Sequence, residues 1–167
     1  LYDEALGCLQ SMQVDNVLPN VVTNICTLKL FAGIGSLTNA VYIHLSISKT
    51  GLEKGLIIGT ALVDMYAKFG LLNEAESVFD SMSDRDIVSW NALIAGYLEY
   101  GFKYQAISCL KRMEIEGISP NSLSWNTVIL SLINYGESQK AFSLYAQMQE
   151  TGLLPDTTVF TSLLKAC

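Results

Sequence analysis

The sequence predicts an all-α fold, an α-solenoid of stacked antiparallel helix pairs, and three observations lead to this prediction. The chain of 167 residues resembles itself at intervals of 31 or 35 residues. Each interval contains two successive segments whose apolar residues recur with the period of an α-helix. No stretch shows sustained alternation of apolar and polar residues between turn signals, so no strand is predicted. An isolated helix pair could not bury its apolar face, and neighbouring pairs must therefore stack.

The repetition is first visible around the only two tryptophans. The stretch "SWNALIAGYLEYG" begins at Ser89, and "SWNTVILSLINYG" begins at Ser124. The three prolines stand in similar contexts, "NVLPN", "GISPN" and "GLLPD", at Pro19, Pro120 and Pro155. Because proline cannot continue a helix, each of these contexts is predicted to be a turn between one helix pair and the next.

Cutting the chain after the residue that follows each proline gives a partial repeat, four full repeats and the start of another: 1–20, 21–55, 56–86, 87–121, 122–156 and 157–167. Three internal positions support these boundaries independently of the prolines. The fifteenth residue of each full repeat is a glycine: Gly35, Gly70, Gly101 and Gly136. The twentieth is an alanine: Ala40, Ala75, Ala106 and Ala141. The twenty-seventh is large and apolar: Ile47, Met82, Met113 and Met148.

Two helices are predicted in each repeat, as residues 87–121 illustrate. The first helix carries Leu93, Ile94 and Tyr97 at helical spacing and ends at Gly101, which suits a C-cap glycine. The second helix follows, with the alanine at the twentieth position allowing a close approach of the two helices, and ends near Gly117.

Composition excludes several classes of function. No apolar run reaches the roughly 18 residues needed to span a bilayer, so no membrane contact is predicted. The net charge of −6 argues against binding nucleic acid by bulk electrostatics, although a few placed side chains could still recognise it. The four cysteines form no CxxC pair, and Cys8 and Cys109 fall where a helix would bury them. With His44 as the only histidine, no metal or nucleophilic site, no cofactor and no small-molecule substrate is predicted.

The repeats resemble those of the pentatricopeptide repeat family. Two stretches, "VSWNALIAGYLEYG…AISCLKRMEIEGISPN" and "LSWNTVILSLINYG…AFSLYAQMQETGLLPD", resemble its standard 35-residue repeat. "LIIGTALVDMYAKFGLLNEAESVFDSMSDRD" resembles its short 31-residue repeat, and "VVTNICTLKLFAGIGSLTNAVYIHLSISKTGLEKG" resembles the long type, which "TTVFTSLLKAC" also begins. The mixture resembles the plant PLS subclass, and the family fold implied is a right-handed superhelix. The tetratricopeptide pattern fits less well, because the tryptophans stand in the wrong context.

The resemblance implies that each repeat recognises one base of single-stranded RNA through its fifth and last residues. The implied base-reading pairs are Thr60 with Asp86, Asn91 with Asn121, and Asn126 with Asp156, joined by Asn20 of the leading repeat and Thr161 of the trailing one. In the family these pairs favour guanine, then cytosine over uracil, then uracil, with the RNA running from 5′ to 3′ along the chain. The expected core is therefore 5′-G, C or U, then U. A side-chain amide can match a pyrimidine edge because it carries both a donor and an acceptor.

The second residue of each repeat is implied to pack against the base: Val22, Ile57, Val88 and Leu123. Thr158 departs from this apolar pattern. In repeat 21–55 the reading positions hold Ile25 and Gly55, which offer no hydrogen-bonding side chain. Editing cofactor proteins are therefore expected on that repeat, since the family uses long-type repeats in this way. Lys68 either contacts an RNA phosphate, as the family does at this place, or is a solvated lysine.

Structural alternatives compete with several of these roles. Asn91 and Asn126 could bond local backbone at a helix start instead of reading a base. Trp90 and Trp125 could stack on bases, but packing between helices is the favoured interpretation. His44 is expected to be structural, and the acidic residues from Glu74 to Asp84 are expected to form a solvated face.

The resemblance implies a specificity factor for cytidine-to-uridine editing of RNA in plant mitochondria or chloroplasts. The HxE…CxxC signature of the deaminase is absent, so this chain is expected not to be an enzyme. It begins without Met and reads as the inside of a helix, so it is expected to be part of a longer protein whose targeting signal lies elsewhere. Two alternatives remain open: RNA processing or stabilisation without editing, and a protein-binding helical-repeat adaptor, which the acidic charge favours slightly.

Overall fold

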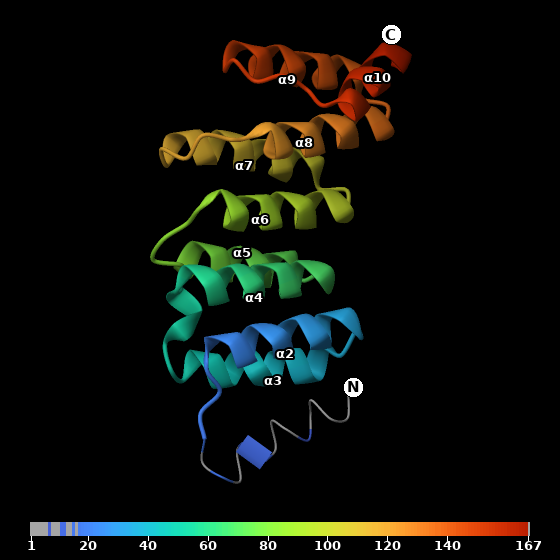
Figure 1. Ribbon diagram of the computed structural model, residues 1–167. Coiled ribbons are helices and arrows are strands. Elements are labelled where there is room, and N and C mark those ends of the chain that lie inside the picture. Colours follow the sequence, from blue (N-terminus) through green and yellow to red (C-terminus); the bar gives the residue numbers. More distant parts are fainter. Residues whose placement is uncertain (1–6, 8–10, 13–14, 16, 167) are drawn as a thin grey trace. The chain divides into compact units, whose positions relative to one another are not determined.

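The computed structural model describes residues 7, 11, 12, 15 and 17–166, so most of the leading partial repeat lies outside the described residues (Figure 1). The regular structure of the described part is helical: α2 (Val21–Gly33), α3 (Leu37–Ser48), the 3₁₀ helix η1 (Leu52–Lys54), α4 (Leu56–Lys68), α5 (Leu72–Ser81), α6 (Ile87–Glu99), α7 (Lys103–Ile115), α8 (Ser122–Asn134), α9 (Ser138–Glu150) and α10 (Thr157–Lys165). The described residues contain no strand, and the predicted all-α class is confirmed.

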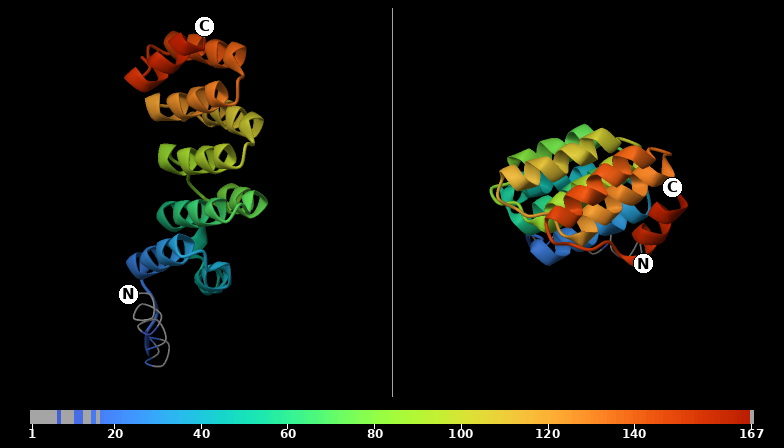
Figure 2. Two further views of the ribbon diagram at one scale, coloured as in Figure 1. Left: turned by 90° about the vertical axis from the view of Figure 1, so that its right-hand side faces the viewer. Right: turned by 90° about the horizontal axis from the view of Figure 1, so that it is seen from above.

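The chain divides into two compact units, an N-terminal unit that ends at Arg85 and a C-terminal unit that begins at Asp86. In the N-terminal unit, α2 pairs with α3, α4 pairs with α5, and α4 packs against α2. In the C-terminal unit, α6 pairs with α7 and α8 with α9, while α8 packs on α6 and α7, and α10 packs on α8 and α9 (Figure 2). Each unit therefore stacks helix pairs in the manner that the predicted solenoid requires.

Glycine ends the first helix of every pair, at the fifteenth position of each repeat. Gly35, Gly70, Gly101 and Gly136 have φ between 72° and 78°. This left-handed conformation suits glycine because a side chain there would crowd the backbone. The residue after the glycine then donates its N–H to a carbonyl five residues back, as Phe102 does to Tyr97 at 2.8 Å. This geometry is the Schellman arrangement, and it confirms the predicted C-cap glycines.

The core of each pair centres on the alanine at the twentieth position. Ala40, Ala75, Ala106 and Ala141 are all 0% exposed, and the large residues at the twenty-seventh position are buried beside them. Trp90 and Trp125 are also buried, with the Arg112 guanidinium 5.2 Å from the centre of the Trp90 ring. The favoured interpretation that the tryptophans pack between helices is confirmed, and the alternative that they stack on bases is wrong because their faces are covered.

The short repeat closes without a glycine turn. Helix α5 ends at Ser81, and Met82 turns the chain into an extended conformation. The Arg85 side chain then folds back: Nε donates to the Phe79 carbonyl and Nη2 to the Asp80 carbonyl, each at 3.0 Å. These bonds satisfy carbonyls that the helix end leaves without an internal partner, so the guanidinium takes the place of a longer loop.

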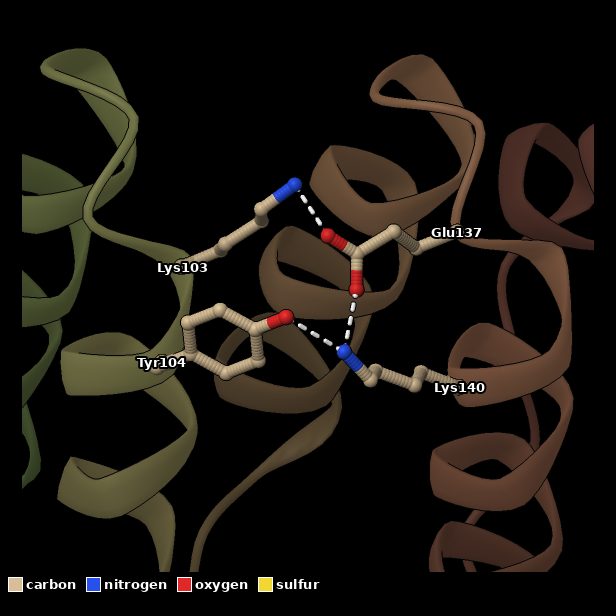
Figure 3. Close-up of polar contacts among 4 residues, drawn as sticks. All are labelled: Lys103, Tyr104, Glu137 and Lys140. Atoms are coloured by element: carbon tan, nitrogen blue, oxygen red, sulfur yellow. Dashed lines mark hydrogen bonds and ion pairs between the residues drawn. The ribbon is translucent and has the colours of Figure 1, made fainter.

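A polar cluster joins α7 to α9 in the C-terminal unit, which Figure 3 shows in close-up. Glu137 forms ion pairs with both Lys103 and Lys140, the second at 2.7 Å. The Lys140 ammonium also donates to the Tyr104 hydroxyl at 2.5 Å. Hydrogen bonds from Lys103 and then Lys140 hold the pKa of Glu137 below its ordinary value. Lys140 and Tyr104 are exposed while Lys103 and Glu137 are half-buried, so solvent screens the cluster in part, and it ties neighbouring repeats together.

His44 has a structural role in the N-terminal unit, as expected. Its Nδ1 lies 2.6 Å from the Tyr66 hydroxyl of α4, and the two rings meet edge to face with their centres 5.4 Å apart. Burial lowers the pKa of His44, and the charge of Glu53 opposes this effect more weakly. The folded N-terminal unit therefore favours the neutral imidazole.

Cys109 is buried, as predicted, whereas Cys26 is exposed; Cys8 and Cys167 lie outside the described residues. Among the residues that the structure describes, no group of histidine, cysteine, aspartate and glutamate side chains could hold a metal ion. Within that same part of the chain, no helix has the length and apolar character needed to cross a membrane.

We predict that the stability of the N-terminal unit falls as the pH drops below the ordinary histidine pKa of 6.5. Because the pKa of His44 is lowered in the folded state, the unfolded chain takes up the proton first. The contribution of the neutral ring is complete above 6.5 and is lost as the pH falls through the lowered folded value. Urea midpoints at about pH 7.5 and about pH 5.5 measure this loss.

His44→Gln is the control for this prediction, because it keeps a polar side chain but removes the titrating ring. The wild-type midpoint should fall more steeply between the two pH values than the midpoint of the variant. An equal fall in both proteins would show that carboxylates, and not His44, cause the pH dependence.

Candidate nucleic-acid interface

The second residue of each first helix is a large aliphatic side chain that faces solvent. Val22, Ile57, Val88 and Leu123 are 58–66% exposed. Buried residues stand close to them in the same helices, such as Ile58 directly after Ile57 and Trp90 two residues after Val88, so their exposure is not a property of the whole helix start. Single exposed apolar residues are common on proteins, but one at the same position of four helices has no role in the core. This set of side chains, called the aliphatic row because it recurs along the sequence, is the strongest indication of a binding surface in each unit. Thr158 of α10 is exposed at the same position of its helix.

The predicted last residues of the repeats are the N-caps of the helices that follow them. Asn20, Asp86, Asn121 and Asp156 each accept a hydrogen bond at Oδ1 from the backbone N–H of the residue three positions on, at 2.7–3.0 Å. Gly55 occupies the equivalent position before α4 and has no side chain with which to cap. Each capping side chain uses one terminal atom for the cap and keeps a second one, Oδ2 of Asp or Nδ2 of Asn, for other contacts.

This capping role of the last residues was not predicted, and a possible helix-start role was considered for the fifth residues instead. The signal was present in the sequence, because Asp and Asn directly before an apolar helix are preferred N-cap residues. Asp86 with Ser89 and Asn121 with Ser124 form this capping box in the structure.

The fifth residues divide into three kinds. The hydroxyls of Thr60 and Thr161 donate to carbonyls four residues back in their own helices, at 2.7 and 2.9 Å. Ile25 is apolar and half-buried. Asn91 is half-buried, and its Oδ1 accepts a hydrogen bond from the Ser124 hydroxyl at 2.6 Å.

Asn126 differs from Asn91, although both are asparagines at the fifth position. It is only 6% exposed, and its buried Oδ1 has no hydrogen-bond partner among the described residues. Neither asparagine bonds its local backbone. The alternative that the two asparagines act as helix-start residues is therefore wrong.

One predicted base-reading pair is brought together by a shared contact. The Ser124 hydroxyl lies 2.6 Å from Oδ1 of Asn91 and 3.0 Å from Oδ1 of Asn121, so it links the fifth and last residues of repeat 87–121. No such link joins Asn126 to Asp156 among the described contacts. Thr60 belongs to the N-terminal unit and Asp86 to the C-terminal unit.

Lys68 at the end of α4 forms an ion pair with Asp64, one helical turn earlier, at 2.9 Å. Both side chains are a little under half exposed, and such pairs on one helix are worth only about a few tenths of a kcal/mol. Because a phosphate could compete with this carboxylate at little cost, a phosphate contact at Lys68 stays a prediction.

Comparison with protein families identifies the repeats. A model described as "PPR repeat" matches residues 60–87, one described as "Pentatricopeptide repeat domain" matches residues 84–135, and one described as "PPR repeat family" matches residues 120–167. Together these matches run from residue 60 to residue 167, which is more than half of the chain.

Curated relatives and solved structures agree with these matches. A mitochondrial pentatricopeptide repeat-containing protein of Arabidopsis thaliana is 40% identical over 71% of this chain and 15% of its own length. A chloroplastic one from the same plant is 41% identical over 68% of this chain and 18% of its own length. The chain thus spans less than a fifth of either relative.

Among solved structures, that of the maize pentatricopeptide repeat protein PPR10 aligns with 95% of this chain and 23% of its own, with a TM-score of 0.82 and 25% identity. The same protein in complex with an 18-nt psaJ RNA element aligns with 99% of this chain and 25% of its own, with a TM-score of 0.79 and 24% identity. The family models, the relatives and the shared solenoid fold lead to one conclusion: this chain belongs to the pentatricopeptide repeat family.

Proposed function

We propose that this chain binds single-stranded RNA, with one base for each repeat. The observation that carries the proposal is the row of exposed aliphatic residues at the second position of α2, α4, α6 and α8. A base inserted between two such side chains would bury them, and this aliphatic contact would replace the sequence-tolerant stacking on aromatic side chains that commonly holds single-stranded nucleic acid. The relation to PPR10, which forms a complex with an RNA element, supports the choice of ligand.

Selectivity would come from the polar residues on either side of that row. The repeats proposed to recognise bases are 56–86, 87–121 and 122–156, with guanine, then cytosine over uracil, then uracil as their preferred bases. Asn20, the last residue of the leading repeat, would contact the base before this core, and Thr161, the fifth residue of the trailing repeat, would contact the base after it. Repeat 21–55 has no hydrogen-bonding side chain at either position and would discriminate little.

The charge of the chain limits how tightly it can bind. A net charge of −6 gives little general attraction for phosphate, and Lys68 is the one side chain assigned to such a contact. Affinity would therefore depend on base contacts, and three repeats would give only weak binding. This favours a chain that works as part of a longer array, as its small share of its relatives' length suggests.

For the complete protein we propose the PLS subclass and a role as a specificity factor in cytidine-to-uridine RNA editing in mitochondria or chloroplasts. The mixture of 31- and 35-residue repeats and the mitochondrial and chloroplastic names of the relatives support this assignment. The long-type repeat 21–55 is the proposed contact for editing cofactor proteins, and RNA processing without editing is the nearest alternative.

A protein-binding adaptor is the second candidate function, because an acidic chain with exposed aliphatic side chains could also bind a basic, amphipathic peptide. The restriction of the last residues to Asp and Asn does not argue against it, since helix capping alone explains that restriction. RNA binding experiments separate the two candidates directly.

Binding to RNA should discriminate at the predicted core. In an otherwise uniform single-stranded RNA, a 5′-GCU core should bind this chain more tightly than cores in which adenine replaces the guanine or the cytosine. Each mismatch should cost about 1–3 kcal/mol, as mismatches do in other specific nucleic-acid sites. Filter binding at fixed salt measures the difference, and equal affinity for all three RNAs would contradict the proposed assignment of bases.

The aliphatic row should contribute to affinity without contributing to stability. Leu123→Ser should weaken RNA binding by about 1 kcal/mol, roughly fivefold, because it removes apolar surface that the base would bury. The urea midpoint should stay unchanged, since Leu123 is exposed in the free chain. Ile115→Ser is the matched control: Ile115 is 84% exposed on α7, outside the row, and its replacement should leave RNA affinity unaltered.

Editing can be tested on the transcripts themselves. Sequencing of organellar transcripts from plants that lack the full-length protein should reveal at least one cytidine, downstream of a matching core, that is no longer converted to uridine. Reintroduction of the gene should restore conversion. Unaltered editing with a loss of transcript ends or abundance would instead support RNA processing or stabilisation.

A further inference from the structure

Two asparagines at the same position of neighbouring repeats have different hydrogen-bonding environments. Oδ1 of Asn91 is held by the Ser124 hydroxyl at 2.6 Å, whereas the buried Oδ1 of Asn126 has no hydrogen-bond partner among the described residues. The partner of Asn91 is the third residue of the next repeat. The equivalent third residue after Asn126 is Val159, a buried side chain that can neither donate nor accept.

The single hydroxyl proton of Ser124 can be assigned from the surrounding contacts. Oδ1 of Asn121 already accepts the Ser124 backbone N–H at 3.0 Å, and the Ser124 hydroxyl oxygen accepts the Asn121 backbone N–H at 3.3 Å. The shortest contact of the hydroxyl is the one to Asn91. Placing the proton there satisfies every group in the cluster, and Ser124 is buried, so no water competes for it.

This assignment fixes which end of the Asn91 amide is left for a ligand. Its carbonyl points to Ser124, so the half-buried side chain presents its NH₂ group, which is a donor. In the reversed orientation Nδ2 would donate to the Ser124 oxygen, but 2.6 Å is the length of an O–H···O bond and is short for an N–H···O bond, so the spacing favours the carbonyl towards Ser124. Oδ1 of Asn126 is buried in the structure but has no partner there, so a reversal of this amide would break no bond of Oδ1 and would turn the carbonyl outward as an acceptor.

Cytosine and uracil differ at the atom that such an amide would meet. N3 of cytosine is an acceptor, while N3 of uracil carries a hydrogen and is a donor. We propose that the third residue of the following repeat sets the pyrimidine preference of the fifth residue: Ser124 directs Asn91 towards cytosine, and the absence of a hydroxyl at Val159 leaves Asn126 free to accept uracil. This inference rests on the proposed RNA binding and names a specificity-determining residue that contacts no base itself.

Exchanging the two third residues tests the inference. Ser124→Val should reduce the preference for cytosine over uracil at the second base of the core by about three- to tenfold, the effect of one neutral hydrogen bond. Val159→Ser should shift the third base towards cytosine by a similar factor. Each variant should leave the other base unaffected. The third position of other repeats already holds Ile58 and Val159, so an aliphatic side chain at Ser124 is expected to be compatible with folding. Kd values for RNAs that differ only at these two bases, measured by fluorescence anisotropy at fixed salt, give the ratios.

Ser89→Ala is the matched control, because Ser89 makes the same capping-box contacts with Asp86 that Ser124 makes with Asn121. It should change neither pyrimidine ratio. Asn121→Asp tests the role of the last residue: a carboxylate should draw the Ser124 proton away from Asn91, so this change should lower the cytosine preference in the wild-type background but not in a Ser124→Val background.

The outcomes separate this inference from the proposed function. If the wild-type chain discriminates bases but Ser124→Val weakens cytosine and uracil equally, Ser124 is only structural and the inference is wrong. It is also wrong if Asn121→Asp has the same effect in both backgrounds. If the wild-type chain binds no RNA, or binds all sequences equally, the proposed function fails and the inference fails with it. If circular dichroism shows that the Val159→Ser variant is unfolded, the Ser124→Val and Asn121→Asp variants still test the inference.

Discussion

The capping of the first helix in each repeat is the constraint on which much of this structure depends. The first backbone N–H groups of a helix have no partner within it, and the turn before each first helix must supply an acceptor. Asn20, Asp86, Asn121 and Asp156 do this with one side-chain oxygen each. The second residue stands one position into each capped helix and faces solvent, as Ile57 also does in α4, where Gly55 provides no side-chain cap. Helix initiation thus places the proposed binding surface.

This double use changes what the pattern of Asp and Asn residues means. Their recurrence before each first helix suggests base recognition, but capping alone would also select them. The exposed aliphatic row has no such alternative explanation, since Val22, Ile57, Val88 and Leu123 neither cap nor pack in the core. Capping and recognition are compatible, because the cap occupies one terminal atom of the side chain and leaves the other.

Much of the fold was predictable because it follows from local rules. The glycines at the fifteenth position predicted helix ends, since only glycine tolerates the left-handed conformation found there. The alanines at the twentieth position predicted close helix contact, and all are fully buried. Trp90 and Trp125 were predictable as core residues because they lie on the apolar side of an amphipathic helix. The role of Arg85 was not predictable, since nothing in the sequence shows that its side chain turns back on the end of α5.

In the candidate site, too, some properties follow from the sequence and others depend on tertiary contacts. The sequence by itself determined the class of fold, the period of the repeat and which residues recur at the second, fifth and last positions, because these properties depend on spacing along one helix. Only the tertiary structure decided the state of each side chain. Asn91 and Ser124 are 33 residues apart and meet because α8 packs on α6, whereas Asn126 has no partner. Two identical "SWN" stretches therefore have different hydrogen-bonding surroundings, since an amide is oriented by its neighbour in space and not by its neighbours in sequence.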